Sequence, residues 1–236
     1  MNNAARAHWV RFIASAFVGL LATTSVSGTE SDPGIWAIFS TQGAFRGDDA
    51  DSRWLYHFDI QARYFDLGSG VNQWLVRRAV VYKLSKQVNG WFGFARFRTS
   101  TANNITVDED RLWQQLDWAR GTMATGRTIF RTRLEQRFVS AGDDTALTLR
   151  LMVKYVRSTG YKGSYLLVGI EPFLDFLDTD WGGPSGLTQN RAFAGLVIPL
   201  SSSLTAEVGY MNQYFSLESR ENQMNNLGIF QINGKF

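Results

Sequence analysis

Residues 128–138 read T-I-F-R-T-R-L-E-Q-R-F, and this stretch decides the fold. Its alternate positions fall into an ionic set and a mostly apolar set: Ile129, Arg131, Arg133, Glu135 and Arg137 against Phe130, Thr132, Leu134, Gln136 and Phe138. A strand sends successive side chains to opposite faces, so the pattern predicts a strand, whereas a helix would mix the two sets. A soluble sandwich would turn the apolar face inward. A membrane barrel would turn it out to lipid and line its lumen with the charges.

The same alternation recurs along the chain. From Arg53 to Asp66 it holds strict register for twelve residues. Soluble strands usually have about 5 or 6 residues and tilted membrane strands about 9 to 11, so this length favours a membrane strand. Eleven segments are predicted as strands: residues 34–45, 53–66, 73–84, 91–99, 111–119, 128–138, 147–155, 164–175, 187–200, 204–215 and 225–236. Because single-chain bacterial barrels have even strand numbers, we expect ten or twelve strands in an antiparallel up-and-down barrel, with twelve preferred.

The amino-terminal residues are typical of a secretory signal peptide. Two arginines and a histidine precede a short apolar run at 12–21, and S-V-S at 25–27 offers small side chains for cleavage. The run is about half of the ~20 residues that a spanning helix needs, although an uncleaved anchor is the alternative. We therefore expect a cleaved signal peptide at 1–27 and a transmembrane barrel at 28–236, in the outer membrane of a Gram-negative bacterium.

The composition fits this class of protein and excludes others. Aromatic residues make up 14% of the chain, with 8 Trp and 17 Phe, which suits aromatic girdles at membrane interfaces. The absence of cysteine excludes a disulfide framework. Removal of the leader takes two arginines and leaves 22 basic and 21 acidic residues, which gives no reason to expect nucleic acid. The expected partners are outer-membrane lipids and the outer-membrane assembly machinery, whose signal a last strand ending in Phe236 resembles.

The barrel interpretation collects charged side chains in the lumen. The predicted network consists of Arg78, Arg96, Arg98, Arg111, Asp117, Arg131, Arg133, Glu135, Arg137, Arg150, Glu171, Arg191 and Glu207. Asp59, Arg63, Lys154 and Asp175 are expected beside them. Buried charges are tolerated only when they are paired or hydrated, so one interpretation is a salt-bridged filling that holds a narrow barrel in register. The other is a pore or pocket with an excess of cations, which attracts anionic solutes or lipid phosphates.

Residues suited to catalysis or cofactor binding are few. His57 is the one histidine after the leader; a hydroxyl nucleophile needs such a base within reach, and no nearby serine supplies the partner, although Asp59 shares its face. The acidic stretches 48–51, 108–110 and 143–144 are interpreted as ordinary loops rather than metal sites. No phosphate loop, dinucleotide fingerprint, zinc spacing or nucleophile elbow occurs. We therefore expect no enzyme activity, no metal and no cofactor.

Five segments resemble one bacterial family. They are R-L-W-Q-Q-L (111–116), R-T-R-L-E-Q-R-F (131–138), E-P-F (171–173), Q-N-R-A-F-A-G-L (189–196) and V-G-Y-M-N-Q-Y (208–214). The family is catalogued as a domain of unknown function and is grouped with outer-membrane β-barrels. The resemblance covers about residues 36–236. It implies a fold and a location, and it implies no activity.

Three functions are compatible with such a barrel. The preferred one is a narrow porin-like channel for small anionic solutes through the arginine-rich lumen. The alternatives are a closed structural or adhesion barrel with a salt-bridged lumen, and an outer-membrane lipid-modifying hydrolase that would use His57. A soluble lipocalin-like barrel with its apolar face inward is the alternative fold. Long registers, aromatic residues near strand ends and the terminal Phe236 favour the membrane barrel over it.

Overall fold

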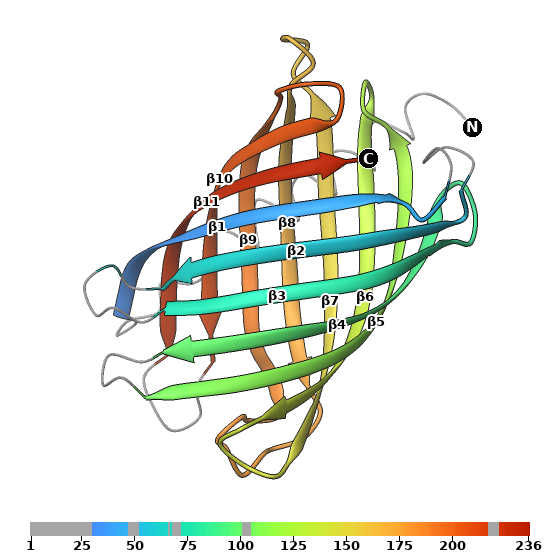
Figure 1. Ribbon diagram of the computed structural model, residues 1–236. Coiled ribbons are helices and arrows are strands. Elements are labelled where there is room, and N and C mark those ends of the chain that lie inside the picture. Colours follow the sequence, from blue (N-terminus) through green and yellow to red (C-terminus); the bar gives the residue numbers. More distant parts are fainter. Residues whose placement is uncertain (1–29, 47–51, 66, 68–71, 101–104, 217–221) are drawn as a thin grey trace, which may run out of the picture.

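The computed structural model describes residues 30–46, 52–65, 67, 72–100, 105–216 and 222–236. These residues form an all-β closed barrel (Figure 1), which confirms the predicted fold class. The predicted signal peptide at 1–27 lies outside the described residues. Within the described ranges, no helix has the length and apolar character needed to cross a membrane.

Eleven strands form the described barrel, and each matches one of the eleven predicted segments. They are β1 (Glu30–Ala44), β2 (Trp54–Tyr64), β3 (Asn72–Lys83), β4 (Val88–Ser100), β5 (Thr106–Thr122), β6 (Gly126–Val139), β7 (Thr145–Ser158), β8 (Tyr165–Asp175), β9 (Gly186–Pro199), β10 (Leu204–Phe215) and β11 (Gln223–Lys235). Strands that follow each other in sequence pair antiparallel. The strict alternation of the sequence therefore located every described strand.

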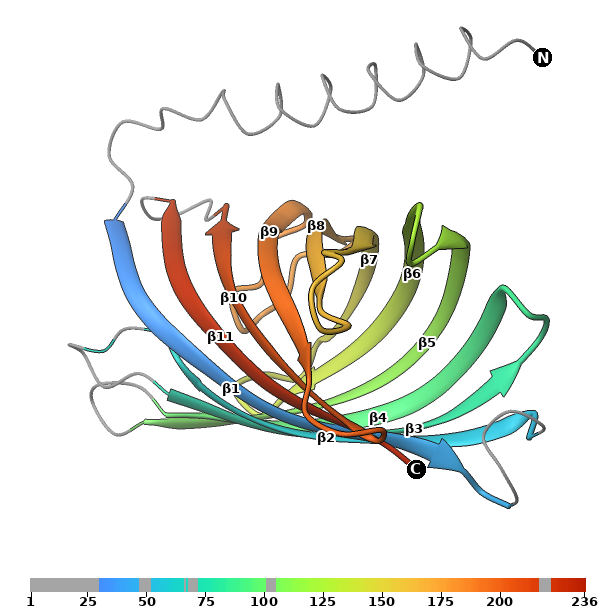
Figure 2. The ribbon, with the colours of Figure 1, turned by 90° about the horizontal axis from the view of Figure 1, so that it is seen from above.

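The barrel closes through a parallel pair of strands. β1 pairs antiparallel with β2 on one side and parallel with β11 on the other, and Figures 1 and 2 both show β1 beside β11. The last residue takes part, because the Phe236 N–H donates to the Gln42 carbonyl at 3.0 Å. The expectation of an even strand number was wrong. An odd number closes without a free edge when the first and last strands run in the same direction.

The two ends of the barrel carry different connections. We call the end at which β11 finishes the turn end; its connections include 123–125 and 200–203. The connection 123–125 lies between Gly121 and Gly126, whose positive φ angles of 90° and 104° are costly for other residues. The opposite end, which we call the loop end, carries the longer connection 176–185.

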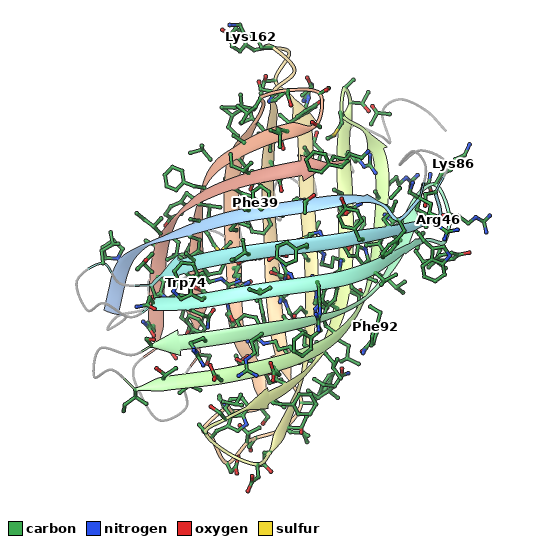
Figure 3. The ribbon with its side chains drawn as sticks, in the orientation of Figure 1. Phe39, Arg46, Trp74, Lys86, Phe92 and Lys162 are labelled. Atoms are coloured by element: carbon green, nitrogen blue, oxygen red, sulfur yellow. The ribbon has the colours of Figure 1, made fainter. Side chains whose placement is uncertain are left out.

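The strands turn their apolar faces outward. Phe39, Trp74 and Phe92 lie on the outer surface (Figure 3) with 44%, 51% and 58% of their area exposed. On β2 the outward Phe58 is followed by Asp59, which points into the lumen and is buried. The lipocalin-like alternative, in which apolar side chains would fill the interior, is therefore wrong.

Apolar residues also occur inside the barrel, in two small clusters. They are Leu75, Ala79, Ala95, Phe97 and Trp113, and Trp36, Leu227 and Ile229. Gly93 on β4 makes room for one of the rings, since a Cβ atom at this position would lie 2.3 Å from the Trp113 side chain. The interior therefore packs aromatic rings beside the charged side chains.

Candidate functional site

The lumen contains a cavity of about 830 Å³. It touches Gly183 and Ser216 at the loop end and Gln42 at the turn end, so it extends along the barrel. Ten cationic side chains line it: Arg63, Arg77, Arg111, Arg131, Arg133, Arg137, Arg150, Lys154, Arg191 and Lys235. Six anionic side chains line it: Asp59, Glu109, Asp117, Glu171, Asp175 and Glu207. The described wall of the cavity therefore carries an excess of positive charge.

Most of the predicted network lies inside the barrel. The structure places Arg111, Asp117, Arg131, Arg133, Glu135, Arg137, Arg150, Glu171, Arg191 and Glu207 on inward faces. On each strand these charged residues share one alternating face, most completely on β6. Strand alternation alone positions them toward the lumen.

Three predicted members lie on the outer surface instead: Arg78, Arg96 and Arg98. On β3 the neighbouring Arg77 points inward, and its Nε donates to Asp59 Oδ2 at 2.7 Å. Arg78 is thereby left on the outer face, with its guanidinium 5.3 Å from the centre of the Phe94 ring. Because Arg77 and Arg78 are consecutive, the sequence allows either one to face the lumen. The prediction placed Arg78 there, and this was wrong.

Arg96 and Arg98 are outward because the lumen face of β4 is aromatic rather than charged. They pair on the outer surface with β5: Arg96 Nη1 lies 2.7 Å from Asp110 Oδ2, and Arg98 Nε lies 2.8 Å from Asp108 Oδ1. The inward Phe97 has the Arg111 guanidinium 4.0 Å from its ring centre. An aromatic ring is a favourable neighbour for a buried cation, so aromatic faces belong inside this barrel as well as outside.

The sequence-based prediction missed three charged residues that line the lumen: Arg77, Glu109 and Lys235. The stretch 108–110 was interpreted as a loop, but β5 already begins at Thr106. Glu109 accepts from Arg137 Nε at 2.6 Å and from Arg111 Nε at 2.8 Å. The signal for Glu109 was present in the sequence, because alternation continues backwards from Arg111 to that position.

Glu135 is the centre of an arginine–carboxylate network. It is 2% exposed and accepts from Arg111 Nη1 at 2.8 Å, Arg150 Nη1 at 2.7 Å and Arg133 Nη1 at 3.3 Å. Arg150 also donates through Nη2 to Glu171 at 2.8 Å. Because guanidinium groups pair with carboxylates through several N–H groups at once, the network joins β5, β6, β7 and β8 across the lumen.

Aromatic rings hold the arginines of this network in place. The Arg133 guanidinium lies 4.2 Å from the Trp113 ring centre, and the Arg150 guanidinium lies 4.4 Å from the centre of Phe173. Such contacts attract a cation to the ring face and fix the direction of its N–H groups. The arginines around Glu135 are therefore held by both carboxylates and rings.

The half of the lumen toward the turn end is less tightly paired. Asp117 accepts from Arg131 Nε at 3.0 Å. Lys154 and Glu207 line the cavity, and neither makes a hydrogen bond or salt bridge with another described residue. This half therefore presents charged groups that remain available to solutes.

Sequence comparison places the chain in a family. A family profile described as "Protein of unknown function (DUF2490)" matches residues 33–225. The chain belongs to the DUF2490 family. An uncharacterized protein of Methylorubrum extorquens is 32% identical over 160 residues, which is 67% of this chain and 70% of that protein. No solved structure matches. The DUF2490 match runs from β1 into β11, and it confirms the resemblance to a family of unknown function.

His57 of this DUF2490 protein contacts a carboxylate and forms no catalytic triad among the described residues. Its Nε2 lies 2.9 Å from Asp59 Oδ2, which also accepts from Arg77. Asp59 Oδ1 accepts from Gln61 Nε2 at 2.8 Å. Ser40, which also lines the lumen, donates to Asn233 Oδ1 at 2.6 Å instead of to His57.

Two loops of the DUF2490 barrel are clasped together at the loop end. Asp180 accepts from the backbone N–H groups of Asp143 and Asp144 at 2.9 and 3.2 Å, and its own N–H donates to Asp144 Oδ2 at 2.8 Å. The Asp143 N–H bond holds the pKa of the Asp180 carboxyl below its usual range. Trp181 Nε1 donates to the Asp144 carbonyl at 3.1 Å, and its ring centre lies 5.2 Å from the Arg137 guanidinium. This loop clasp therefore contacts the lumen network.

Proposed function

We propose that this DUF2490 protein is an outer-membrane β-barrel of a Gram-negative bacterium and forms a narrow channel for small anions. The observation that carries the proposal is the lumen cavity, with its ten cationic and six anionic lining residues. A pore wall with excess positive charge favours anions. The outward aromatic and aliphatic side chains support a lipid environment, because exposed apolar surface of this extent is unfavourable in water.

The size of the cavity limits what such a channel could carry. A volume of about 830 Å³ spread over the ~30 Å of a bilayer core gives a mean cross-section of roughly 30 Å². Eleven strands lie between the small barrels that side chains fill and the 16- to 18-stranded porins with wide aqueous lumens. The proposed solutes are therefore inorganic anions and short carboxylates.

The proposal extends to how the chain reaches the membrane. The leader at 1–27 would direct export and be cleaved, and outer-membrane lipids would cover the barrel. The assembly machinery would recognise β11 together with the aromatic residue that follows it, Phe236. We propose no catalytic role for His57, because its Nε2 contacts Asp59 and no serine or threonine hydroxyl is bonded to it among the described residues.

Conductance of the refolded chain, residues 28–236, in planar bilayers tests the channel. We expect discrete steps and a reversal potential in a salt gradient that indicates anion preference. Arg131→Gln removes a lumen cation and also frees Asp117, so anion preference should fall. Arg78→Gln removes the same charge from the outer surface and should leave selectivity unchanged.

One observation favours a second candidate, a closed structural barrel. Arg133 is 4% exposed and Glu135 is 2% exposed, so the centre of the network leaves little room for water. If the folded protein gives no conductance steps at high protein load, or prefers cations, the channel proposal fails. A structural role that acts through the loops would then be the better interpretation.

A further inference from the structure

Trp36 lies between two arginines from different strands. It is 3% exposed on β1, and its ring centre lies 4.1 Å from the guanidinium carbon of Arg63 and 5.0 Å from that of Arg191. Arg63 is its direct neighbour in the β1–β2 register, whereas Arg191 reaches it from β9. All three side chains line the lumen cavity.

The two arginines are poorly neutralised. Arg63 makes no salt bridge with a described residue; its Nε and Nη2 donate to Gln61 Oε1 at 3.0 and 2.6 Å, and its Nη1 donates to Gln73 Oε1 at 2.8 Å. These bonds use three of its five N–H groups. The Glu171 oxygen near Arg191 is 3.7 Å away, which is longer than a normal hydrogen bond. The Trp36 ring therefore has two cations beside it: among the described residues Arg63 has no carboxylate partner, and Arg191 has one carboxylate that is too far away for a hydrogen bond.

The other described groups in contact with Arg191 are neutral. They include the side-chain amides of Gln189 and Gln213 and the Phe173 ring, whose centre lies 4.6 Å from the guanidinium. In contrast, Arg111 in the same lumen has two carboxylates at 2.8 Å. A buried charge without a counter-charge is unfavourable. The surroundings of Trp36 therefore differ from the Glu135 network in one respect: no described carboxylate lies within hydrogen-bond distance of their arginines.

Trp36 itself carries an unused donor. Its indole Nε1 is buried and has no hydrogen-bond acceptor among the described residues. Buried donors in native proteins are nearly always paired with protein groups, water or ligand. An indole N–H accepts nothing, so the group that completes this site must supply an acceptor. An anion supplies the acceptor and the missing negative charge together.

We propose that Trp36, Arg63 and Arg191 form a binding site for a small oxyanion, of the size of inorganic phosphate or a short carboxylate. The anion oxygens would accept from the unused N–H groups of Arg63 and from the Trp36 indole N–H. Oxyanions suit the site better than chloride because their several oxygens match the planar fork of a guanidinium. The inference rests on the proposed function in one respect, since the anion must reach the site through the lumen.

Binding can be measured without any conductance experiment. The refolded chain in detergent is titrated with inorganic phosphate, and separately with acetate, at constant ionic strength held with chloride. Tryptophan fluorescence and thermal unfolding are recorded. We expect saturable binding and a rise in Tm, with the two titrations distinguishing a phosphate site from a carboxylate site. Arg63→Gln should weaken binding about tenfold or more, because a charged hydrogen-bond donor is lost.

Two further variants keep the test informative if Arg63→Gln does not fold. Trp36→Phe retains the ring and removes only the N–H, so it should weaken binding several-fold without a change in charge. Arg63→Lys retains the charge and should bind with intermediate affinity. Arg78→Gln, on the outer surface, is the matched control and should bind like the wild type.

The outcomes separate this site from the channel. If folded wild-type protein responds to neither phosphate nor acetate, or if Trp36→Phe and the Arg63 variants bind like the wild type, the site does not exist. Phosphate binding by a barrel that gives no conductance would refute the channel and keep the site. Conductance from a barrel that binds neither anion would refute the site alone.

Discussion

Replacing Glu135 with glutamine should destabilise the barrel through one particular arginine. Glu135 accepts from Arg111, Arg133 and Arg150, but two of these retain another carboxylate: Arg111 keeps Glu109, and Arg150 keeps Glu171. Arg133 would lose the one carboxylate that it contacts among the described residues and keep neutral neighbours, the Gln115 oxygen at 2.6 Å and the Trp113 ring. The substitution therefore creates one buried, unpaired guanidinium. Removing one partner of a buried pair costs about 3–5 kcal/mol.

Urea unfolding of the refolded protein in lipid vesicles measures this cost. Glu135→Gln should lower the free energy of unfolding by about 3–5 kcal/mol. Adding Arg133→Met removes the stranded charge and should restore most of the loss, so the double-mutant cycle should give a large coupling energy between the two positions. Asp110→Asn is the control, because Asp110 lies near the loop-end start of β5 and its partner Arg96 is exposed there; it should cost at most about 1 kcal/mol.

Two results would contradict this reasoning. A loss below about 1 kcal/mol for Glu135→Gln would mean that water or an ion reaches Arg133 and replaces the carboxylate. Failure of Arg133→Met to restore stability would mean that the Glu135 carboxylate acts through geometry rather than charge. In either case the network would not be the tightly packed centre described above.

Two further predictions concern packing and pH. Gly93→Ala should lower the free energy of unfolding by about 1–3 kcal/mol in the same assay, because its Cβ would lie 2.3 Å from the Trp113 side chain. Gly90→Ala is the control and should be nearly neutral, because its Cβ would lie 3.4 Å from the nearest atom, in the Leu84 side chain. Equal losses of stability in the two variants would contradict this prediction. For the loop clasp, the pKa of Asp180 is lowered on folding, so its contribution is complete above the usual carboxyl pKa and is lost as pH falls through the lowered value. Amide hydrogen exchange at Asp143 should therefore speed up beyond the intrinsic change as the pH falls from about 5 to about 2, and Asp180→Asn should abolish that pH dependence; identical profiles would refute the clasp.

The strands could be predicted from sequence because each one alternates strictly between two environments. In β6 the alternation separates five charged side chains from the residues between them, and no other secondary structure does so. In β3 the alternation does not decide which residues face the lumen. Its Arg77 and Arg78 are consecutive, and its neighbouring Val80 and Val81 are both apolar, so the sequence does not fix the phase. Only pairing with Asp59 on the next strand decides it.

The site around Trp36 could not be predicted for a different reason. Its parts lie on β1, β2 and β9, and no pattern along the chain links Trp36 to Arg191. The assumption that charged side chains face the lumen and aromatic ones face lipid also hid it. Inside this barrel the arginines need aromatic rings, as Arg111 needs Phe97, so both kinds of side chain occupy both faces.

The odd strand number has a consequence for assembly. Every antiparallel pair joins strands adjacent in sequence, whereas the parallel closure joins residues such as Trp36 and Ile229 at opposite ends of the chain. Closing the longest loop costs the most chain entropy, so the β1–β11 pair should form last. Until then β11 has a free edge that the proposed assembly machinery could bind. On closure the Phe236 N–H bonds to the Gln42 carbonyl, and β11 no longer has a free edge. The assembly machinery would thus bind β11 before closure and release it when β1 takes its place.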